Sequence, residues 1–229
     1  MELYDVMRTT FAARQFTDDP VDDATLYRIL DHARFAPSGG NRQGWCVIVI
    51  RDRAKRAALV DLIRPTMKRY FAQAAAGENP FNTIVPTTVG DAEVAAAQVP
   101  SGMIESMVEA PVLLLVAVDL RVLASFDSTL PRVGVISGAS IYPFVWNILL
   151  AARNEGLGGT ITTFLAPAEA EARTMFGLPE YFAVAALLPI GKPVKQLTKL
   201  KRKPVEEFAA VDRYGGAPLV AKRGQTTSR

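Results

Sequence analysis

The chain has 229 residues, of which 49% are hydrophobic and 21% are charged. This is the composition of a soluble globular protein with a sizeable core, and it excludes a disordered chain. The net charge of +3 is too small for a dedicated nucleic-acid-binding protein. The single cysteine, Cys46, excludes an internal disulfide and a Cys-based zinc site, and the single histidine, His32, excludes any metal or catalytic site that needs two imidazoles.

The positive charge is concentrated toward the C-terminal end. Residues 192–229 are strongly basic, whereas residues 1–191 carry more acids than bases. Such a segment could be a solvated tail, a nucleic-acid-binding arm or a clamp for a phosphorylated ligand. Residues 192–203 lack the interleaved aromatic side chains of a nucleic-acid-binding arm, so we expect no nucleic-acid partner.

Neither a secretory signal nor a membrane span is expected. The first ten residues, MELYDVMRTT, include two acids and no apolar signal core, so we expect a cytoplasmic protein. Residues 133–152 carry no charge and are long enough to cross a bilayer. They also contain glycine, serine, proline and asparagine, which favour a helix buried in a core or a subunit interface.

The first half of the chain predicts two helices, a strand and a third helix. Apolar spacing indicates a helix over 3–9 and another that Asp22 or Asp23 caps and Pro37 ends. The apolar run at 45–50, WCVIVI, predicts a strand buried on both faces, and residues 54–75 a helix. Residues 76–109 contain three prolines and no sustained period, which predicts a flexible lid with some helix; with the end of the preceding helix, the lid segment spans about 65–110.

The second half predicts two more buried strands, at 112–118 and 182–188. An uncharged helix is expected from 133 to about 154, with Pro143 either kinking it or marking its true beginning. We expect extended chain at 160–164, a helix at 168–176 and a short helix near 204–208. Buried strands interleaved with helices indicate a layered α/β or α+β fold, and we expect one domain over 1–214 and a polar, mobile tail over 215–229.

Familiar catalytic motifs are absent from the sequence. His32 has no serine or cysteine nucleophile signature nearby, and no Walker A sequence is present. The glycines of Gly156-Leu157-Gly158-Gly159 follow a helix and precede extended chain, whereas a Rossmann fingerprint follows a strand and opens a helix. Nicotinamide binding on a Rossmann domain is therefore not expected.

The most informative segment is APSGGNRQGW at 36–45. It combines a helix end, a flexible Ser38-Gly39-Gly40 backbone and the amide side chains of Asn41 and Gln43. Such a loop offers backbone N–H groups and polar side chains to a planar heteroaromatic ligand. An ordinary helix-to-strand connection is the alternative.

At these residues the sequence resembles the flavin-dependent nitroreductase family, whose members carry an A-P-S-x-x-N-x-Q-x-W segment. The run from Arg14 to Val21 resembles the family's Arg-x-Phe plus D-x-P-V run, and the run from Asn147 to Gly159 resembles its central helix ending in Gly-Leu-Gly. Arg202-Lys203-Pro204 with Glu206 resembles its basic C-terminal segment. The four segments occur in the family's order over residues 1–208.

The resemblance implies an α+β fold, a three-layer sandwich with a mixed or antiparallel central sheet and helices on both faces. It also implies a homodimer with FMN at the interface, lined by the Pro37–Asn41 loop of one subunit and Arg14 of the other. Family members often have Arg-Arg-Ser before the position of Arg14, where this chain has Thr10, Phe11 and Ala12, so Thr10 is left as a stand-in donor. The implied cofactor-binding residues are Thr10, Arg14, Pro37, Ser38, Gly39, Asn41, Leu157, Gly158, Gly159, Lys201 and Arg202.

The implied activity is ping-pong hydride transfer from NADH or NADPH through FMN to a nitroaromatic, quinone or similar conjugated acceptor, with no side chain nominated as catalytic and no metal. Two other chemistries of the fold, reductive dehalogenation and flavin fragmentation, remain alternatives, as does a non-catalytic flavin-binding protein. The dehalogenase alternative needs a Glu, a Tyr and a Lys in the lid; the lid segment offers Lys68, Tyr70 and Glu78, at spacings that do not match convincingly.

Overall fold

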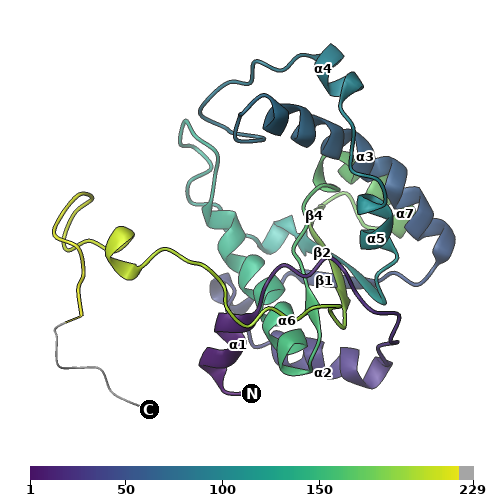
Figure 1. Cartoon of the computed structure of the whole chain (residues 1–229), viewed down its shortest axis with the longest axis horizontal. Helices are drawn as coiled ribbons and strands as arrows, with labels where there is room; N and C mark the ends of the chain where they lie inside the picture. Colours follow the sequence, from purple (N-terminus) through teal and green to yellow (C-terminus); the bar gives the residue numbers. More distant parts are fainter. Residues whose placement is uncertain (222–229) are drawn as a thin grey trace. The chain divides into compact units, whose positions relative to one another are not determined.

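The computed structural model describes residues 1–221 as two compact units, drawn in Figure 1. The first is Met1–Leu197 and the second begins at Thr198, ahead of the boundary expected after residue 214. The second unit contains a short 3₁₀ turn, Val205–Glu207, where a short helix is expected. The part of the expected mobile tail that falls on 222–229 lies outside the described residues.

The first unit is organised around a four-stranded antiparallel sheet. Its strands are β1 (Trp45–Val49), β2 (Val112–Asp119), β3 (Gly158–Gly159) and β4 (Phe182–Gly191), in the order β1-β2-β4-β3. The three long strands are the three continuous apolar runs of the sequence. β2, at the centre, is buried along almost its whole length, which explains its lack of polar residues.

Helices cover both faces of the sheet, as Figure 1 shows. α2 (Asp23–Ala33) and α6 (Tyr142–Asn154) pack on the face to which Leu114 and Val116 of β2 point. α3 (Arg53–Ala75), α5 (Met103–Val108) and α7 (Glu169–Phe176) pack on the other face, over Leu113 and Leu115. Successive side chains of a strand point to opposite faces, so one apolar run supplies both cores. The expected three-layer α+β fold is confirmed.

The N-terminal residues form a further border of the sheet. α1 (Leu3–Thr9) contacts α6, and the extended chain after it runs beside β3 and the end of β4. Ala12 forms a parallel bridge with Gly159, Phe16 pairs with Pro193, and the Ala13 N–H donates to the Gly159 carbonyl at 3.0 Å. These bonds fix the backbone on either side of Arg14.

Of the two alternatives for the uncharged helix, the structure has the one in which Pro143 marks its beginning. Residues 136–140 form a separate 3₁₀ turn, and α6 starts only at Tyr142, with Pro143 in its first turn. Proline has no N–H to donate and its ring clashes with the preceding turn, so it belongs at a helix start rather than its interior. The helix is also not buried on all sides within one chain, because Tyr142 and Trp146 are 42% and 40% exposed.

The lid segment contains some helix, as expected. α3 continues to Ala75, and the chain then passes through α4 (Asp91–Ala96) and α5 before β2. The segment expected to be extended at 160–164 forms an isolated bridge with β4 between Thr162 and Leu187, and the Thr160 N–H donates to the Pro189 carbonyl at 3.4 Å. Within residues 1–221, no helix combines the length and apolarity needed to cross a bilayer.

Candidate functional site

A cavity of about 1030 Å³ opens between the extended N-terminal segment, α3, the lid segment and residues 160–167. Its walls are largely apolar and aromatic, with Phe11, Tyr70, Phe81 and Phe164 among them. Serine and threonine side chains, the Gln15 side chain and two cationic side chains are its polar lining groups. A large apolar cavity with a few polar groups suits an organic ligand with an aromatic ring system.

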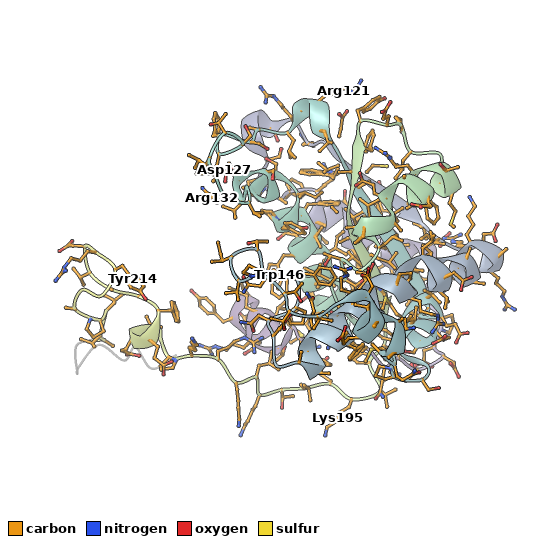
Figure 2. All side chains as sticks on the ribbon, turned by 90° about the horizontal axis from the view of Figure 1, so that it is seen from above. Arg121, Asp127, Arg132, Trp146, Lys195 and Tyr214 are labelled. Atoms are coloured by element: carbon orange, nitrogen blue, oxygen red, sulfur yellow. The ribbon has the colours of Figure 1, made fainter. Side chains whose placement is uncertain are left out.

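The charge of the cavity comes from cations. Arg14 and Lys195 are the charged side chains among its described lining residues, and no carboxylate lines it. Figure 2 shows Lys195 at the outer edge of the first unit. The cavity therefore favours a ligand that carries negative charge or develops it during a reaction.

Arg14 has unused hydrogen-bonding capacity. Its Nη1 donates to the Ala12 carbonyl at 3.3 Å, and among the described residues it forms no ion pair. Asp19, a possible surface partner, instead accepts from Lys192 at 2.7 Å, and this bond holds the pKa of the Asp19 carboxyl below its usual value. The Arg14 guanidinium has five donors, so most of them remain available to a ligand.

The Pro37–Asn41 loop and the residues just after it turn through the left-handed backbone region, and Gln43 is the strained residue among them. The φ angles of Gly40, Asn41 and Gln43 are 60°, 53° and 51°, in the left-handed region that side chains other than glycine and asparagine rarely adopt. Two hydroxyls hold the loop: the Ser38 Oγ accepts from the Gln43 N–H, and the Ser140 Oγ accepts from the Gly39 N–H, both at 3.0 Å. Strain maintained by such bonds is typical of binding and catalytic loops.

One chain does not bring this loop to Arg14. No residue from Pro37 to Asn41 is among the described residues that line the cavity, although Arg14 and its neighbours are. The two groups of residues expected at one cofactor therefore lie at different places within the first unit.

The Leu157-Gly158-Gly159 segment lies beside the N-terminal border of the sheet. A Cβ atom at Gly159 would lie 2.7 Å from the Pro189 carbonyl oxygen, and one at Gly158 would lie 3.0 Å from the Ala13 Cβ. Close packing inside the chain therefore requires both glycines. The residues that follow, from Thr160, line the cavity, so the segment joins the sheet edge to the cavity wall.

The remaining predicted site residues are less clearly placed for binding. Thr10 is 5% exposed and its hydroxyl donates to the Val6 carbonyl at 2.8 Å, so the hydroxyl is used within α1. Lys201 and Arg202 lie in the second unit, where the Arg202 Nη1 donates to the Lys201 carbonyl at 2.7 Å.

Two of the three lid side chains are already engaged by the protein. The Lys68 Nζ donates to the Ala95 carbonyl at 2.6 Å, and Glu78 accepts from the hydroxyls of Thr87 and Thr88 and from the Thr88 N–H. These bonds lower the pKa of Glu78. Tyr70 lines the cavity and packs edge-on against Phe164, with ring centroids 5.5 Å apart.

Sequence reasoning missed most of the cavity wall. Phe81, Phe164 and Lys195 come from segments that are far apart in the chain and carry no motif. Ser140 was also missed, since 101 residues separate it from its partner Gly39. The aromatic and β-branched character of 160–164 is the one signal in the sequence that points to part of this wall.

Comparisons with known proteins agree with this architecture. The family model described as "Nitroreductase family" matches residues 7–192. An NADH dehydrogenase of Thermus thermophilus is 29% identical over 84% of this chain and 87% of its own length. A 5,6-dimethylbenzimidazole synthase of Rhodospirillum rubrum is 30% identical over 79% and 76%.

Two solved structures share the fold. A BluB-like flavoprotein from Clostridium difficile superimposes with a TM-score of 0.68 at 20% identity, over 93% of this chain and all of the other. An iodotyrosine deiodinase, solved with FMN and 3-iodo-L-tyrosine, superimposes with a TM-score of 0.63 at 22% identity, over 89% and 96% of the two chains. The relatives thus catalyse different reactions on one fold.

Proposed function

Because the chain belongs to the nitroreductase family, we propose that it is an FMN-dependent oxidoreductase that takes reducing equivalents from NADH or NADPH and passes them to a conjugated acceptor such as a nitroaromatic or a quinone. The observation that carries this proposal is the cavity of about 1030 Å³, with its aromatic walls and its uncommitted Arg14. The family membership gives the cavity a chemical context that its shape alone lacks.

The residues of the cavity fit a flavin. Arg14 supplies a fixed positive charge with free donors, which stabilises negative charge that develops on a bound ring system. Phe11 and Ile161 provide apolar surface for a flat ring, and the backbone near Ala13 is held in place by the bond to Gly159. Bound FMN supplies the two-electron hydride chemistry, so the protein needs no nucleophile of its own.

We infer that a second copy of the chain completes the site. The Pro37–Asn41 loop is absent from the cavity of its own chain, and Ser140 links it to residues that precede α6. Val135, Tyr142 and Trp146 of this region are 65%, 42% and 40% exposed, and Figure 2 shows Trp146 on α6. An apolar face beside an unmatched half-site favours a homodimer that buries FMN between the loop of one subunit and Arg14 of the other.

The lid contacts argue against the dehalogenase alternative. Binding the ammonium and carboxylate groups of an amino acid requires free charged side chains, whereas Lys68 and Glu78 are committed to bonds within the lid segment. Lys68 and Glu78 could bind an amino acid only after these hydrogen bonds were broken, which costs free energy. The apolar walls instead favour an uncharged ring or an aromatic anion.

A non-catalytic flavin-binding protein is the second candidate, and Thr10 favours it. The hydroxyl that would replace the family's serine is used within α1, which leaves one donor fewer for a phosphate group. Weak retention of the cofactor is the expected consequence.

The test begins with a titration of the full chain with FMN, followed by flavin fluorescence. Binding, then loss of flavin absorbance when NADH or NADPH is added without oxygen, then its return with menadione, would support the oxidoreductase. Binding without reduction by either nicotinamide would favour the flavin-binding protein, and absence of FMN binding would exclude both.

A pair of variants connects the result to the cavity. Arg14→Gln removes the charge and should weaken FMN affinity about tenfold, a loss of about 1.4 kcal/mol. Arg51→Gln removes an exposed arginine that pairs with Asp23 and does not line the cavity, so it should leave the affinity unchanged.

A further inference from the structure

Phe81 has a backbone conformation that is unusual for a bulky residue. Its φ angle is 56°, in the left-handed region, where a side chain crowds its own backbone. Glycine or asparagine would adopt this turn with less strain, and the chain has a phenylalanine there instead. The side chain is also 44% exposed, so burial offsets little of the strain.

A buried side chain holds Phe81 in this conformation. The Phe81 N–H donates at 3.0 Å to the Oε1 of Gln73, which is 5% exposed near the end of α3. On the other side of the turn, the Asn82 Oδ1 accepts from the N–H groups of Ile84 and Val85, both at 2.8 Å. Glu78 closes the base of this loop through Thr87 and Thr88. The turn therefore has one conformation fixed at several points.

The strained residue Phe81 lies in the wall of the cavity. Phe81 and Pro80 line the cavity from the lid segment, and Tyr70 and Phe164 line it from α3 and from the chain after β3. An aromatic side chain held by the lid reduces the space that remains beside the other two rings. A strained residue at a ligand cavity, maintained by buried hydrogen bonds, is a feature of pre-organised binding sites.

We propose that Phe81 is the specificity-determining residue of the cavity and disfavours aromatic acceptors with a wide fused-ring system. This inference rests on the proposed function, because it treats the cavity as the place where the acceptor binds. Beside the Phe81 side chain, an acceptor of three fused rings has less room than an acceptor of one ring.

The strain itself is measured by comparing two substitutions at one position. Phe81→Ala and Phe81→Gly both remove the ring, but only glycine relieves the left-handed backbone. The midpoint of thermal unfolding of Phe81→Gly should therefore exceed that of Phe81→Ala by about 2–4 °C. Ile84 is 79% exposed on the same loop and does not have a positive φ, so Ile84→Gly should unfold below Ile84→Ala. A lower midpoint for Phe81→Gly than for Phe81→Ala would overturn the strain argument.

Specificity is measured by equilibrium binding in the oxidised, FMN-saturated protein without nicotinamide. Calorimetry with benzoate and with anthracene-2-carboxylate gives a ratio of affinities for one and three rings. Phe81→Ala and Phe81→Gly should shift this ratio toward anthracene-2-carboxylate by about fivefold or more, which corresponds to about 1 kcal/mol. Ile84→Ala, which alters the loop outside the cavity lining, should leave the ratio unchanged.

The possible results separate this inference from the proposed function. An unchanged ratio in both Phe81 variants, or a wild-type protein that binds neither carboxylate, would overturn the role of Phe81. A protein that takes up no FMN would overturn the proposed function and, with it, the acceptor site on which this inference rests. Flavin uptake and reduction with an unchanged ratio would leave the proposed function standing and remove Phe81 from it.

Discussion

The hydroxyl of Ser140 accepts a hydrogen bond from the backbone N–H of Gly39 at 3.0 Å, across 101 residues of sequence. This bond joins the Pro37–Asn41 loop to the 3₁₀ turn that precedes α6. The loop and the exposed apolar face around α6 are therefore coupled through one side chain. A change at the subunit contact that we propose would reach the proposed flavin loop by this route.

Ser140→Ala should destabilise the protein by about 1 kcal/mol, because the Gly39 N–H loses its acceptor. The affinity for FMN should fall together with the stability, because the Pro37–Asn41 loop is then free to leave its left-handed conformation. Urea unfolding and FMN titration measure the two effects. Ser140→Thr keeps the hydroxyl and should retain most of the stability and of the FMN affinity. If Ser140→Ala and Ser140→Thr lose equal amounts, the bond from the Gly39 N–H is not responsible.

Gly159→Ala should be among the more damaging single-methyl additions in the chain. The new Cβ would lie 2.7 Å from the Pro189 carbonyl oxygen and 2.9 Å from the Ile190 side chain, so the sheet edge must move, at about 1–3 kcal/mol. At Gly177 a Cβ meets no atom within 4 Å and the substitution costs only the strain of φ +66°, about 1 kcal/mol. Chemical denaturation of both variants tests the order; a smaller loss at Gly159 would contradict the packing described for β3.

Asp127 should make stability depend on acid pH. Its Oδ2 accepts from the Val135 N–H at 2.8 Å and from Arg132 at 2.7 Å; Figure 2 shows Asp127 and Arg132 close together. The Val135 bond first, then the Arg132 bond, lowers the pKa of the carboxyl below its usual value. The stabilisation is therefore fully present above the unfolded-state pKa of about 3.9 and is lost as the pH falls through the lower folded-state pKa.

The measurement is thermal unfolding of wild type and Asp127→Asn from neutral pH to about pH 2.5. Near neutral pH the wild type should unfold at a higher temperature than Asp127→Asn. The difference between their unfolding temperatures should become smaller below about pH 4. Asp61→Asn, at an exposed position of α3, is the matched control and should show no such narrowing. If the difference in unfolding temperature between wild type and Asp127→Asn does not change with pH, the Asp127 carboxylate is not its cause.

Trp146→Glu should convert the proposed homodimer into a monomer. The side chain is 40% exposed on α6 in a single chain, and a charge buried in an apolar subunit contact carries a desolvation penalty of several kcal/mol. Light scattering should then report half of the wild-type mass, and FMN affinity should fall because each site loses the loop of its partner. Tyr27→Glu, at a 72% exposed position of α2, is the control for an added charge elsewhere. A wild-type protein that is already monomeric at micromolar concentration would contradict the dimer.

The strands and the layered architecture could be predicted because their signal is local. Continuous apolar runs such as that at 112–118 can only be stable when buried on both faces, and the structure places β2 at the centre of the sheet. The start of α6 was left open between two alternatives, because an absence of charge at 133–141 says nothing about backbone geometry; the structure places Pro143 in the first turn. Length and polarity patterns indicate the elements, but a proline does not by itself mark an end: Pro143 lies in the first turn of α6, whereas Pro65 lies inside α3.

The candidate site was predictable only in part. Arg14 and the Pro37–Asn41 loop stand in recognisable segments, so their chemistry can be read from residue types and order. The cavity wall could not be predicted, because Phe81 and Phe164 come to line one cavity only after folding. The left-handed φ of Phe81 could not be predicted either, because phenylalanine rarely adopts it. The hydrogen bond from the Thr10 hydroxyl to the Val6 carbonyl could not be predicted from the sequence either, because it depends on where α1 ends.

The short β3 strand would leave one side of the sheet with unpaired backbone groups if the chain did not return to cover it. Ala12, Ala13 and Phe16 provide that cover through their bonds to Gly159 and Pro193. An uncovered strand border recruits other polypeptides by backbone pairing. A truncation that removes residues 1–16 should therefore produce insoluble self-associated material rather than a smaller, folded version of the protein.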